Sequence, residues 1–124
     1  MVAIIDYGMG NVASVKKAIQ KLDYKATITN IREEIHNADA IILPGVGSFR
    51  VAMDNLQSFG LVNILNEEVL ERRKPILGIC LGMQLLATIG FEDGTTKGLG
   101  FIKGEVIKID VDNLPIPHIG WNDI

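Results

Sequence analysis

The sequence predicts an α/β fold with a mostly parallel, doubly wound sheet. Patches of strand-like pattern alternate along the chain with patches of helical period. The strand-like patches are short, continuous apolar runs, which is typical of strands buried on both faces. Hydrophobic residues make up 48% of the 124 residues and aromatic residues only 6%, so the composition suits an aliphatic core and excludes a disordered chain.

The first half of the chain begins with an apolar run over residues 2–5, which predicts a strand. A helix should follow from Asn11, a residue type suited to the N-cap. Its apolar residues recur with a helical period and should face the core: Val12, Val15, Ile19 and Leu22. We then expect a strand over 25–29, a short polar helix over 31–37, and a strand over 40–43 that Pro44 ends.

The second half predicts a helix over 61–73, a buried strand over 75–79 and a buried helix over 81–89. In the helix over 61–73, the core face should hold Leu61, Ile64, Leu65, Val69 and Leu70, and the solvent face Glu67, Glu68, Glu71 and Arg72. Residues 98–110 indicate a bent β-hairpin or a pair of short strands. Residues 113–124 are too short to finish a domain, so we expect 1–124 to be one partial domain.

Charge and cysteine content exclude several classes of protein. Twelve lysines and arginines against fifteen aspartates and glutamates give a net charge of −3, which argues against a nucleic-acid partner. The single cysteine cannot form an internal disulfide. The chain has no leader-like segment and no apolar run near the roughly 20 residues that cross a bilayer. We therefore expect a cytoplasmic protein with neither a membrane nor a nucleic-acid partner.

The loop after the first strand is only a loose match to a nucleotide-binding motif. Gly8-Met9-Gly10-Asn11-Val12-Ala13 fits the pattern G-x-G-x-x-G/A between a strand and a helix. That motif also needs an acidic residue at the end of the second strand, where Asn30 stands. A tight turn is therefore favoured over a flavin- or nucleotide-binding site.

The most specific motif in the chain is Gly78-Ile79-Cys80-Leu81-Gly82. A nucleophile flanked by glycines between a buried strand and a helix is typical of a nucleophile elbow, whose sharp turn leaves no room for neighbouring side chains. The turn would place the Cys80 sulfur at a helix N-terminus, which favours the thiolate. The N–H of Leu81 would then face a developing oxyanion. The alternative, a small buried core cysteine, does not account for the two glycines.

A second glycine-rich segment, Pro44-Gly45-Val46-Gly47-Ser48-Phe49, follows the third predicted strand. A doubly wound sheet can place that strand beside the one that carries Cys80, and sites in such sheets form at the carboxyl ends of the strands. The glycines would let the backbone approach a substrate carbonyl and add a second N–H to an oxyanion hole. The alternative is a turn that binds no ligand.

A cysteine nucleophile usually works with a histidine base, and the chain has only His36 and His118. His36 lies in a polar stretch, which indicates a surface histidine. His118 belongs to Pro117-His118-Ile119-Gly120-Trp121-Asn122, a cluster that contains the only tryptophan. This composition indicates a binding surface more than a base.

Four motifs in this order resemble the class I glutamine amidotransferases, and among them the glutaminase subunits of imidazole glycerol phosphate synthases from histidine biosynthesis. The motifs span 6–11, 44–49, 78–84 and 117–122, so the resemblance covers essentially the whole chain. Ile119 stands where the family often has methionine. The resemblance implies a three-layer αβα, flavodoxin-like fold, with no cofactor and no metal.

The resemblance also implies a role for each matching residue. Cys80 would attack the carboxamide of glutamine, release ammonia and leave a glutamyl thioester that water hydrolyses. The N–H groups of Leu81 and of Val46 or Gly47 would hold the oxyanion. Gly47 and Gln84 would hold the substrate glutamine.

The partner implied by the resemblance is a cyclase subunit with a (β/α)8 barrel. Asn11, His118 and Trp121 match positions near its docking face, across which ammonia would pass. Two other interpretations stay open: a paralogous amidotransferase subunit of a surface-sugar pathway, and a non-catalytic module that docks on a barrel partner.

The family carries its catalytic histidine and glutamate in a later His-Pro-Glu segment, whereas these 124 residues contain no His-x-Glu pair. We therefore expect the chain alone to lack meaningful glutaminase activity, since the members of a triad act as a unit. We also expect part of the aliphatic surface to be uncovered and the chain to self-associate.

Overall fold

The computed structural model describes residues 1–117 and 119–121. Its main sheet has four parallel strands in the order β2-β1-β3-β4. These strands are β1 (Val2–Ile5), β2 (Ala26–Thr29), β3 (Ala40–Gly45) and β4 (Ile76–Cys80). The expected α/β fold with a mostly parallel, doubly wound sheet is confirmed.

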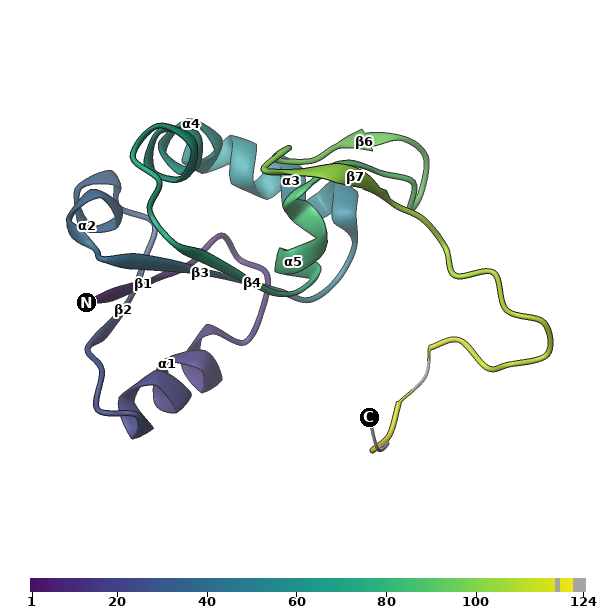
Figure 1. The fold of residues 1–124 in the computed structure, drawn as a ribbon, viewed down its shortest axis with the longest axis horizontal. Helices are drawn as coiled ribbons and strands as arrows, with labels where there is room; N and C mark the ends of the chain where they lie inside the picture. Colours follow the sequence, from purple (N-terminus) through teal and green to yellow (C-terminus); the bar gives the residue numbers. More distant parts are fainter. Residues whose placement is uncertain (118, 122–124) are drawn as a thin grey trace.

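Helices lie on both faces of this sheet (Figure 1). Helix α1 (Val12–Lys21) covers one face beneath β1 and β2. The other face carries α2 (Arg32–Asn37), α3 (Phe49–Ser58), α4 (Leu61–Asn66) and α5 (Leu81–Leu85). A π-helical segment, η1 (Glu67–Glu71), continues from α4. Within the described residues, no helix has the length and apolar character needed to span a membrane.

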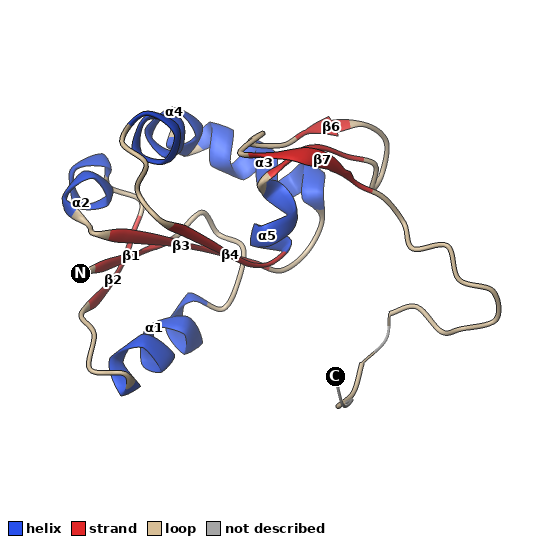
Figure 2. Ribbon diagram, viewed as in Figure 1, coloured by secondary structure: helices blue, strands red, loops and turns tan. Residues whose placement is uncertain are grey.

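A second, smaller sheet lies beside α3 and α5 (Figure 2). It contains β5 (Ala87–Gly90), β6 (Thr96–Lys97) and β7 (Ile102–Val106) in the order β6-β5-β7. Strands β5 and β6 are antiparallel, whereas β5 and β7 are parallel. After β7 the chain runs on without regular structure as far as it is described.

The core fills the space between the main sheet and the layer of α2 to α5. Its buried members are Ile5, Tyr7, Ile35, Ile41, Leu43, Phe49, Ala52, Leu56, Leu61, Ile64, Leu65, Leu81, Leu85, Leu86 and Leu99. Helix α1, by contrast, has no buried residue, and Leu22 at its end is exposed. The expectation that Leu22 faces the core was therefore wrong, because the residue follows the last helical turn.

Strand β3 does not end at Pro44, contrary to prediction. It continues to Gly45, and Pro44 pairs with Ile79 of β4. The Pro44 carbonyl points toward β1, where it accepts a hydrogen bond. In a strand, the carbonyl and the nitrogen of one residue point to the same side, so the nitrogen of Pro44 also points toward β1. The pairing with β1 has already ended at Ile42, so the missing N–H breaks no bond between strands.

Strand β4 was expected to be buried on both faces, but Leu77 and Ile79 are exposed on one of them. The reason is its position, because β4 is the outer strand of the described sheet. Helix α1 lies under β1 and β2 and leaves the same face of β4 open (Figure 1). The expected uncovered aliphatic surface is therefore present on β4.

The predicted helix over 61–73 is divided between α4 and η1, and two of its residues were assigned to the wrong side. Glu68 is fully buried, whereas Leu70 is about half exposed. Glu68 follows Ile64 by four positions and Leu61 by seven, so helical period places it on the core side despite its charge. The position of Glu68 in the helical period, and not the charge of its side chain, therefore determines which face it occupies.

Two further predictions need correction. The helix expected over 81–89 ends at Leu85, and its second half forms β5, where Thr88 and Ile89 favour a strand. The segment 98–110 contributes a single strand, β7, and the hairpin is formed by β5 and β6 instead. Helix α3 was not predicted, although Ser48 caps it.

Candidate functional site

Cys80 lies on a sharp turn between β4 and α5. Its backbone has φ 55° and ψ −118°, a conformation that residues with a side chain rarely adopt. The cysteine is exposed. This strand–turn–helix geometry agrees with the predicted nucleophile elbow.

The glycines around Cys80 stand where backbone segments nearly touch. A Cβ on Gly82 would lie 1.8 Å from the carbonyl oxygen of Leu43 in β3. A Cβ on Gly78 would lie 2.5 Å from the Cα of Met83 in α5. The lack of a side chain at Gly82 therefore lets α5 pack against β3, and the lack of one at Gly78 lets α5 pack back over β4.

The segment after β3 begins beside the cysteine. Gly45, the last residue of β3, is paired with Cys80 in the strand register. Val46 and Gly47 follow, and Gly47 has a φ of 115°. Ser48 then starts α3, because its Oγ accepts a hydrogen bond from the N–H of Val51 at 3.2 Å. Residues 46–48 thus form a short loop from β3 to α3 next to Cys80.

Tyr7 lies beneath this loop and was not predicted to have a role. Its side chain is fully buried, and its hydroxyl donates a hydrogen bond to the Pro44 carbonyl at 2.6 Å. The main-chain carbonyl of Tyr7 accepts a hydrogen bond from Asn55 Nδ2 at 3.0 Å. Burial raises the pKa of the Tyr7 phenol well above its ordinary value, so the group stays protonated.

A pocket of about 620 Å³ opens at this edge of the sheet. It brings together five residues that the sequence motifs singled out: Cys80, Val46, Gly47, Leu81 and Gln84. The remaining walls come from the turn between β5 and β6 and from the chain after β7, namely Phe91, Glu92, Asp93, Val106, Ile107, Lys108, Ile109, Ile116 and Pro117. None of these wall residues was predicted to contribute to the site.

Glu92 connects the β5–β6 turn to the loop after β3. Its Oε2 accepts a hydrogen bond from the N–H of Phe49, the first residue of α3, at 3.1 Å. The Asp93-Gly94 pair is a recognisable hairpin signal in the sequence. It was missed because the preceding residues were taken as a helix.

Two of the residues predicted for the partner surface, Asn11 and Trp121, do not line this pocket. Asn11 caps α1, since its side-chain oxygen accepts a hydrogen bond from the N–H of Ser14 at 3.2 Å. Trp121 is fully exposed. His118 lies outside the described residues. The predicted roles of these residues and of the pocket residues all remain predictions.

The loop after β1 is a tight turn, as expected. Gly8 and Gly10 have φ values of 81° and 115°. The carboxylate of Asp6 accepts a hydrogen bond from the N–H of Gly8 at 3.3 Å. A Cβ on Gly10 would lie 3.1 Å from the backbone nitrogen of Gly45, a tight contact with β3 that glycine avoids.

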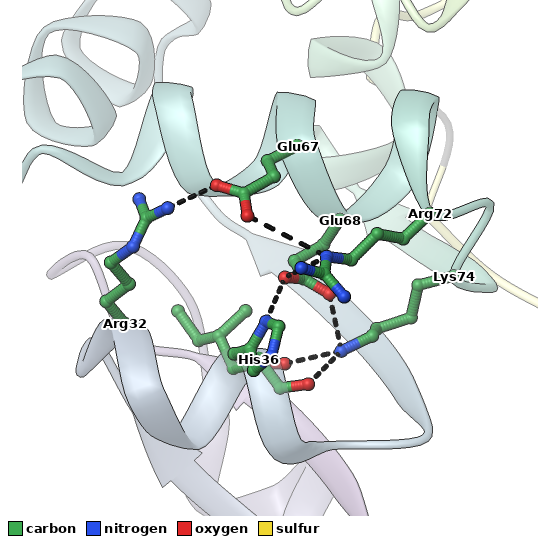
Figure 3. Close-up of polar contacts among 7 residues, drawn as sticks. Arg32, His36, Glu67, Glu68, Arg72 and Lys74 are labelled. Carbon is green, nitrogen blue, oxygen red and sulfur yellow. Dashed lines mark hydrogen bonds and ion pairs between the residues drawn. The ribbon is translucent and has the colours of Figure 1, made fainter.

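A second group of polar residues lies at the opposite end of β4 (Figure 3). Buried Glu68 contacts Lys74 Nζ at 2.7 Å and His36 Nδ1 at 2.7 Å, and Arg72 Nε lies 3.5 Å away. Burial raises the pKa of this carboxyl, but the hydrogen bonds from Lys74 and His36 outweigh that effect and the net pKa is lowered. We call these residues, with Arg32 and Glu67, the Glu68 cluster.

The Glu68 cluster contains a set of atoms with the spacing of metal ligands. One ligand atom each from His36, Glu67 and Glu68 lies within 4.8 Å of the others. Both carboxylates, however, are already paired with cations, Glu67 with Arg32 and Glu68 with Lys74. The cluster therefore has the character of an ion-pair network that holds α2, η1 and the start of β4 together.

Comparison with known proteins identifies a family. The family model described as glutamine amidotransferase class-I matches residues 3–122. A solved structure titled "Crystal structure of glutamine amidotransferase" superposes with a TM-score of 0.71 over 85% of this chain and 55% of that chain. At 20% sequence identity this likeness supports the fold alone.

Two curated relatives match almost the whole chain. Imidazole glycerol phosphate synthase subunit HisH 1 of Campylobacter jejuni is 51% identical, over 100% of this chain and 62% of its own length. Subunit HisH 2 of Methanococcus maripaludis is 54% identical, over 98% of this chain and 60% of its own length. The chain thus spans about three fifths of the length of these relatives.

Proposed function

Because the chain belongs to the class I glutamine amidotransferase family, we propose that it binds glutamine and carries the nucleophile of an imidazole glycerol phosphate synthase glutaminase subunit. The observation that carries this proposal is the register of β3 and β4. It pairs Gly45 with Cys80 and so brings the loop after β3 to the elbow. The names of the relatives favour histidine biosynthesis over a surface-sugar pathway.

The proposed chemistry begins at the sulfur of Cys80. The thiolate attacks the carboxamide carbon of glutamine, and the carbonyl oxygen gains negative charge. The N–H of Leu81 and that of Val46 or Gly47 stabilise this charge. The amide nitrogen then takes up a proton, the carbon–nitrogen bond breaks and ammonia leaves, and water hydrolyses the thioester to glutamate and free thiol. Gln84 lines the pocket, where its amide can bind the polar end of the substrate.

Proton transfer to the leaving nitrogen is usually the task of a histidine that works with the cysteine. Among the residues that the structure describes, no histidine lines the pocket, and His36 belongs to the Glu68 cluster. We therefore propose that the chain captures an activated glutamine analogue but does not turn over glutamine. Steady ammonia release that is lost in Cys80→Ala would contradict this second part.

The test uses a chloroketone analogue of glutamine, which alkylates a cysteine as chloride leaves. Intact mass spectrometry should show a single adduct, because Cys80 is the only cysteine. Cys80→Ala should show none. Excess glutamine should slow the labelling, whereas asparagine, one methylene shorter, should slow it much less. Equal protection by both amino acids, or no adduct at all, would contradict a glutamine site.

We propose further that the chain docks on a (β/α)8-barrel cyclase subunit through Trp121, with Asn11 and His118 nearby. The support is that Trp121 is fully exposed, since large aromatic residues in water are common binding anchors. Trp121→Ala should weaken binding to such a subunit in calorimetry by at least about tenfold. Leu114→Ala, an exposed apolar residue of the same segment, is the matched control and should bind normally.

The same binding experiment separates two candidate functions. A chain that binds the barrel but takes no chloroketone adduct would be a docking module. A chain that takes the adduct and binds the barrel supports the glutaminase function.

The exposed residues of β4 also favour self-association, with Leu77 and Ile79 at the contact. A cytoplasmic location stays a prediction from the sequence.

A further inference from the structure

We propose that Tyr7 is a positioning residue of this site: its hydroxyl holds the end of β3 so that the loop 46–48 presents its N–H groups beside Cys80. The effect of Tyr7 on the reactivity of Cys80 rests on the proposed function. The stabilisation of the loop 46–48 by Tyr7 is a property of the fold alone. Tyr7 would touch neither substrate nor sulfur. It would act through the backbone of Pro44 and Gly45.

The first support is where the hydroxyl is placed. Pairing between β1 and β3 ends at Ile4 and Ile42, two residues before Pro44. Tyr7 follows β1, and its buried hydroxyl donates to the Pro44 carbonyl at 2.6 Å. The side chain thus continues the link between β1 and β3 beyond the last backbone pair. Without it, a buried carbonyl would lose its hydrogen bond.

The second support is that Tyr7 is bonded to both anchors of the loop. The loop 46–48 runs from β3 to α3. The Tyr7 hydroxyl bonds to β3 through Pro44, and its main-chain carbonyl accepts from Asn55 of α3 at 3.0 Å. One residue therefore fixes the distance between the two ends of the loop.

The third support is the contact at Gly45, the residue paired with Cys80. A Cβ on Gly45 would lie 2.7 Å from the Tyr7 hydroxyl oxygen, 2.8 Å from the Gly82 nitrogen and 2.9 Å from Leu81 Cβ. Gly45 is thus enclosed between the Tyr7 hydroxyl and the first turn of α5. A shift of the tyrosine would be passed directly to the backbone beside the elbow.

The experiment compares Tyr7→Phe with Tyr24→Phe, which removes the hydroxyl of the exposed second tyrosine. Each variant is alkylated with the glutamine chloroketone and, separately, with iodoacetamide. The chloroketone depends on the oxyanion donors, whereas iodoacetamide needs only an accessible thiolate. We expect Tyr7→Phe to slow the chloroketone about tenfold while the iodoacetamide rate stays within about twofold. An unchanged chloroketone rate, or an equal loss with both reagents, would overturn the role.

Hydrogen exchange tests whether Tyr7 stabilises the loop 46–48 without any substrate chemistry. In Tyr7→Phe the amides of 46–48 should exchange faster than in the unaltered chain, while those of β2 stay the same. Tyr24→Phe should change neither. Unchanged exchange at 46–48 would refute the positioning role. Faster exchange in a chain that takes no chloroketone would instead refute the proposed function and leave the hold of Tyr7 on the loop standing.

Discussion

The two ends of β4 are fixed by different kinds of interaction. Before the strand, Lys74 contacts buried Glu68 and donates hydrogen bonds to the carbonyls of Ile35 and His36 at 2.8 and 2.7 Å. After the strand, Cys80 is held by backbone contacts of two glycines, and the neighbouring strand by one neutral hydrogen bond from Tyr7. Charge fixes one end, and close packing fixes the other.

This difference fits the chemistry that we propose for the Cys80 end. A cysteine that must react with a neutral amide needs backbone N–H groups at fixed places, and steric fit provides them without adding charge. The carboxylate of Glu92, which lines the same pocket, accepts a hydrogen bond from the N–H of Phe49 and so fixes the start of α3. The ion pairs of the Glu68 cluster lie at the other end of β4, where they anchor the strand.

The largest effect should come from filling the space at the reactive end. Gly82→Ala places a methyl group 1.8 Å from the Leu43 carbonyl, so β3 and α5 must separate. We expect a loss of more than about 3 kcal/mol in the free energy of unfolding, measured by urea denaturation. Gly104→Ala in β7 is the control, because a Cβ there meets nothing within 4 Å. Equal stability of the two variants would contradict the packing argument.

At the charged end, Lys74→Met should be nearly as damaging. The substitution leaves the carboxylate of Glu68 buried without its main cation, which typically costs about 3 kcal/mol. Arg72→Met removes a longer, exposed contact to the same carboxylate and should cost less than about 1 kcal/mol. Urea denaturation of both variants at neutral pH measures the difference, and a larger loss in Arg72→Met would reverse our ranking.

The charged end should make stability depend on acid through Glu68. The pKa of Glu68 is lowered in the folded chain from an ordinary value of 4.5, so its contribution is fully present above that pH. As the pH falls below 4.5, the unfolded chain binds the proton first and the contribution is lost. Thermal unfolding between neutral pH and pH 3 should show a shallower decline for Glu68→Gln than for the unaltered chain. Parallel curves would show that the cluster does not couple to pH.

The smallest effect should come from the exposed face between the two ends. Leu77→Lys puts a charge on the outer strand of the described sheet and should reduce self-association without much loss of stability. Leu22→Lys, on the exposed end of α1, is the matched control and should leave self-association as it is. Sedimentation velocity over a range of concentrations distinguishes the two. If the unaltered chain stays monomeric at high concentration, the expected self-association through β4 is wrong.

The sequence predicts the main sheet well, because its strands are continuous apolar runs bounded by turn residues. It predicts the helices less well where two signals disagree. Glu68 was assigned to solvent by its charge, although helical period places it in the core. Helix α3 was missed even though Ser48 can cap it and Phe49, Ala52 and Leu56 recur at helical spacing.

The residues of the candidate site also divide into those that the sequence predicts and those that it does not. Cys80, Val46, Gly47, Leu81 and Gln84 could be found because short motifs carry them, and all five line one pocket. Tyr7 and Glu92 could not be found in this way. Their contacts join residues 37 and 43 positions apart, so only the folded chain shows them.

The backbone conformation at Cys80 limits which residue types this position can hold. With φ 55° and ψ −118°, the position would be relaxed with glycine, and a side chain there costs roughly 1–3 kcal/mol. A chain selected for stability alone would therefore carry glycine at 80 and would be inert. β-Branched threonine, which serves as a nucleophile elsewhere, is strongly disfavoured at a positive φ. The elbow thus trades stability for the reactivity that we propose for Cys80.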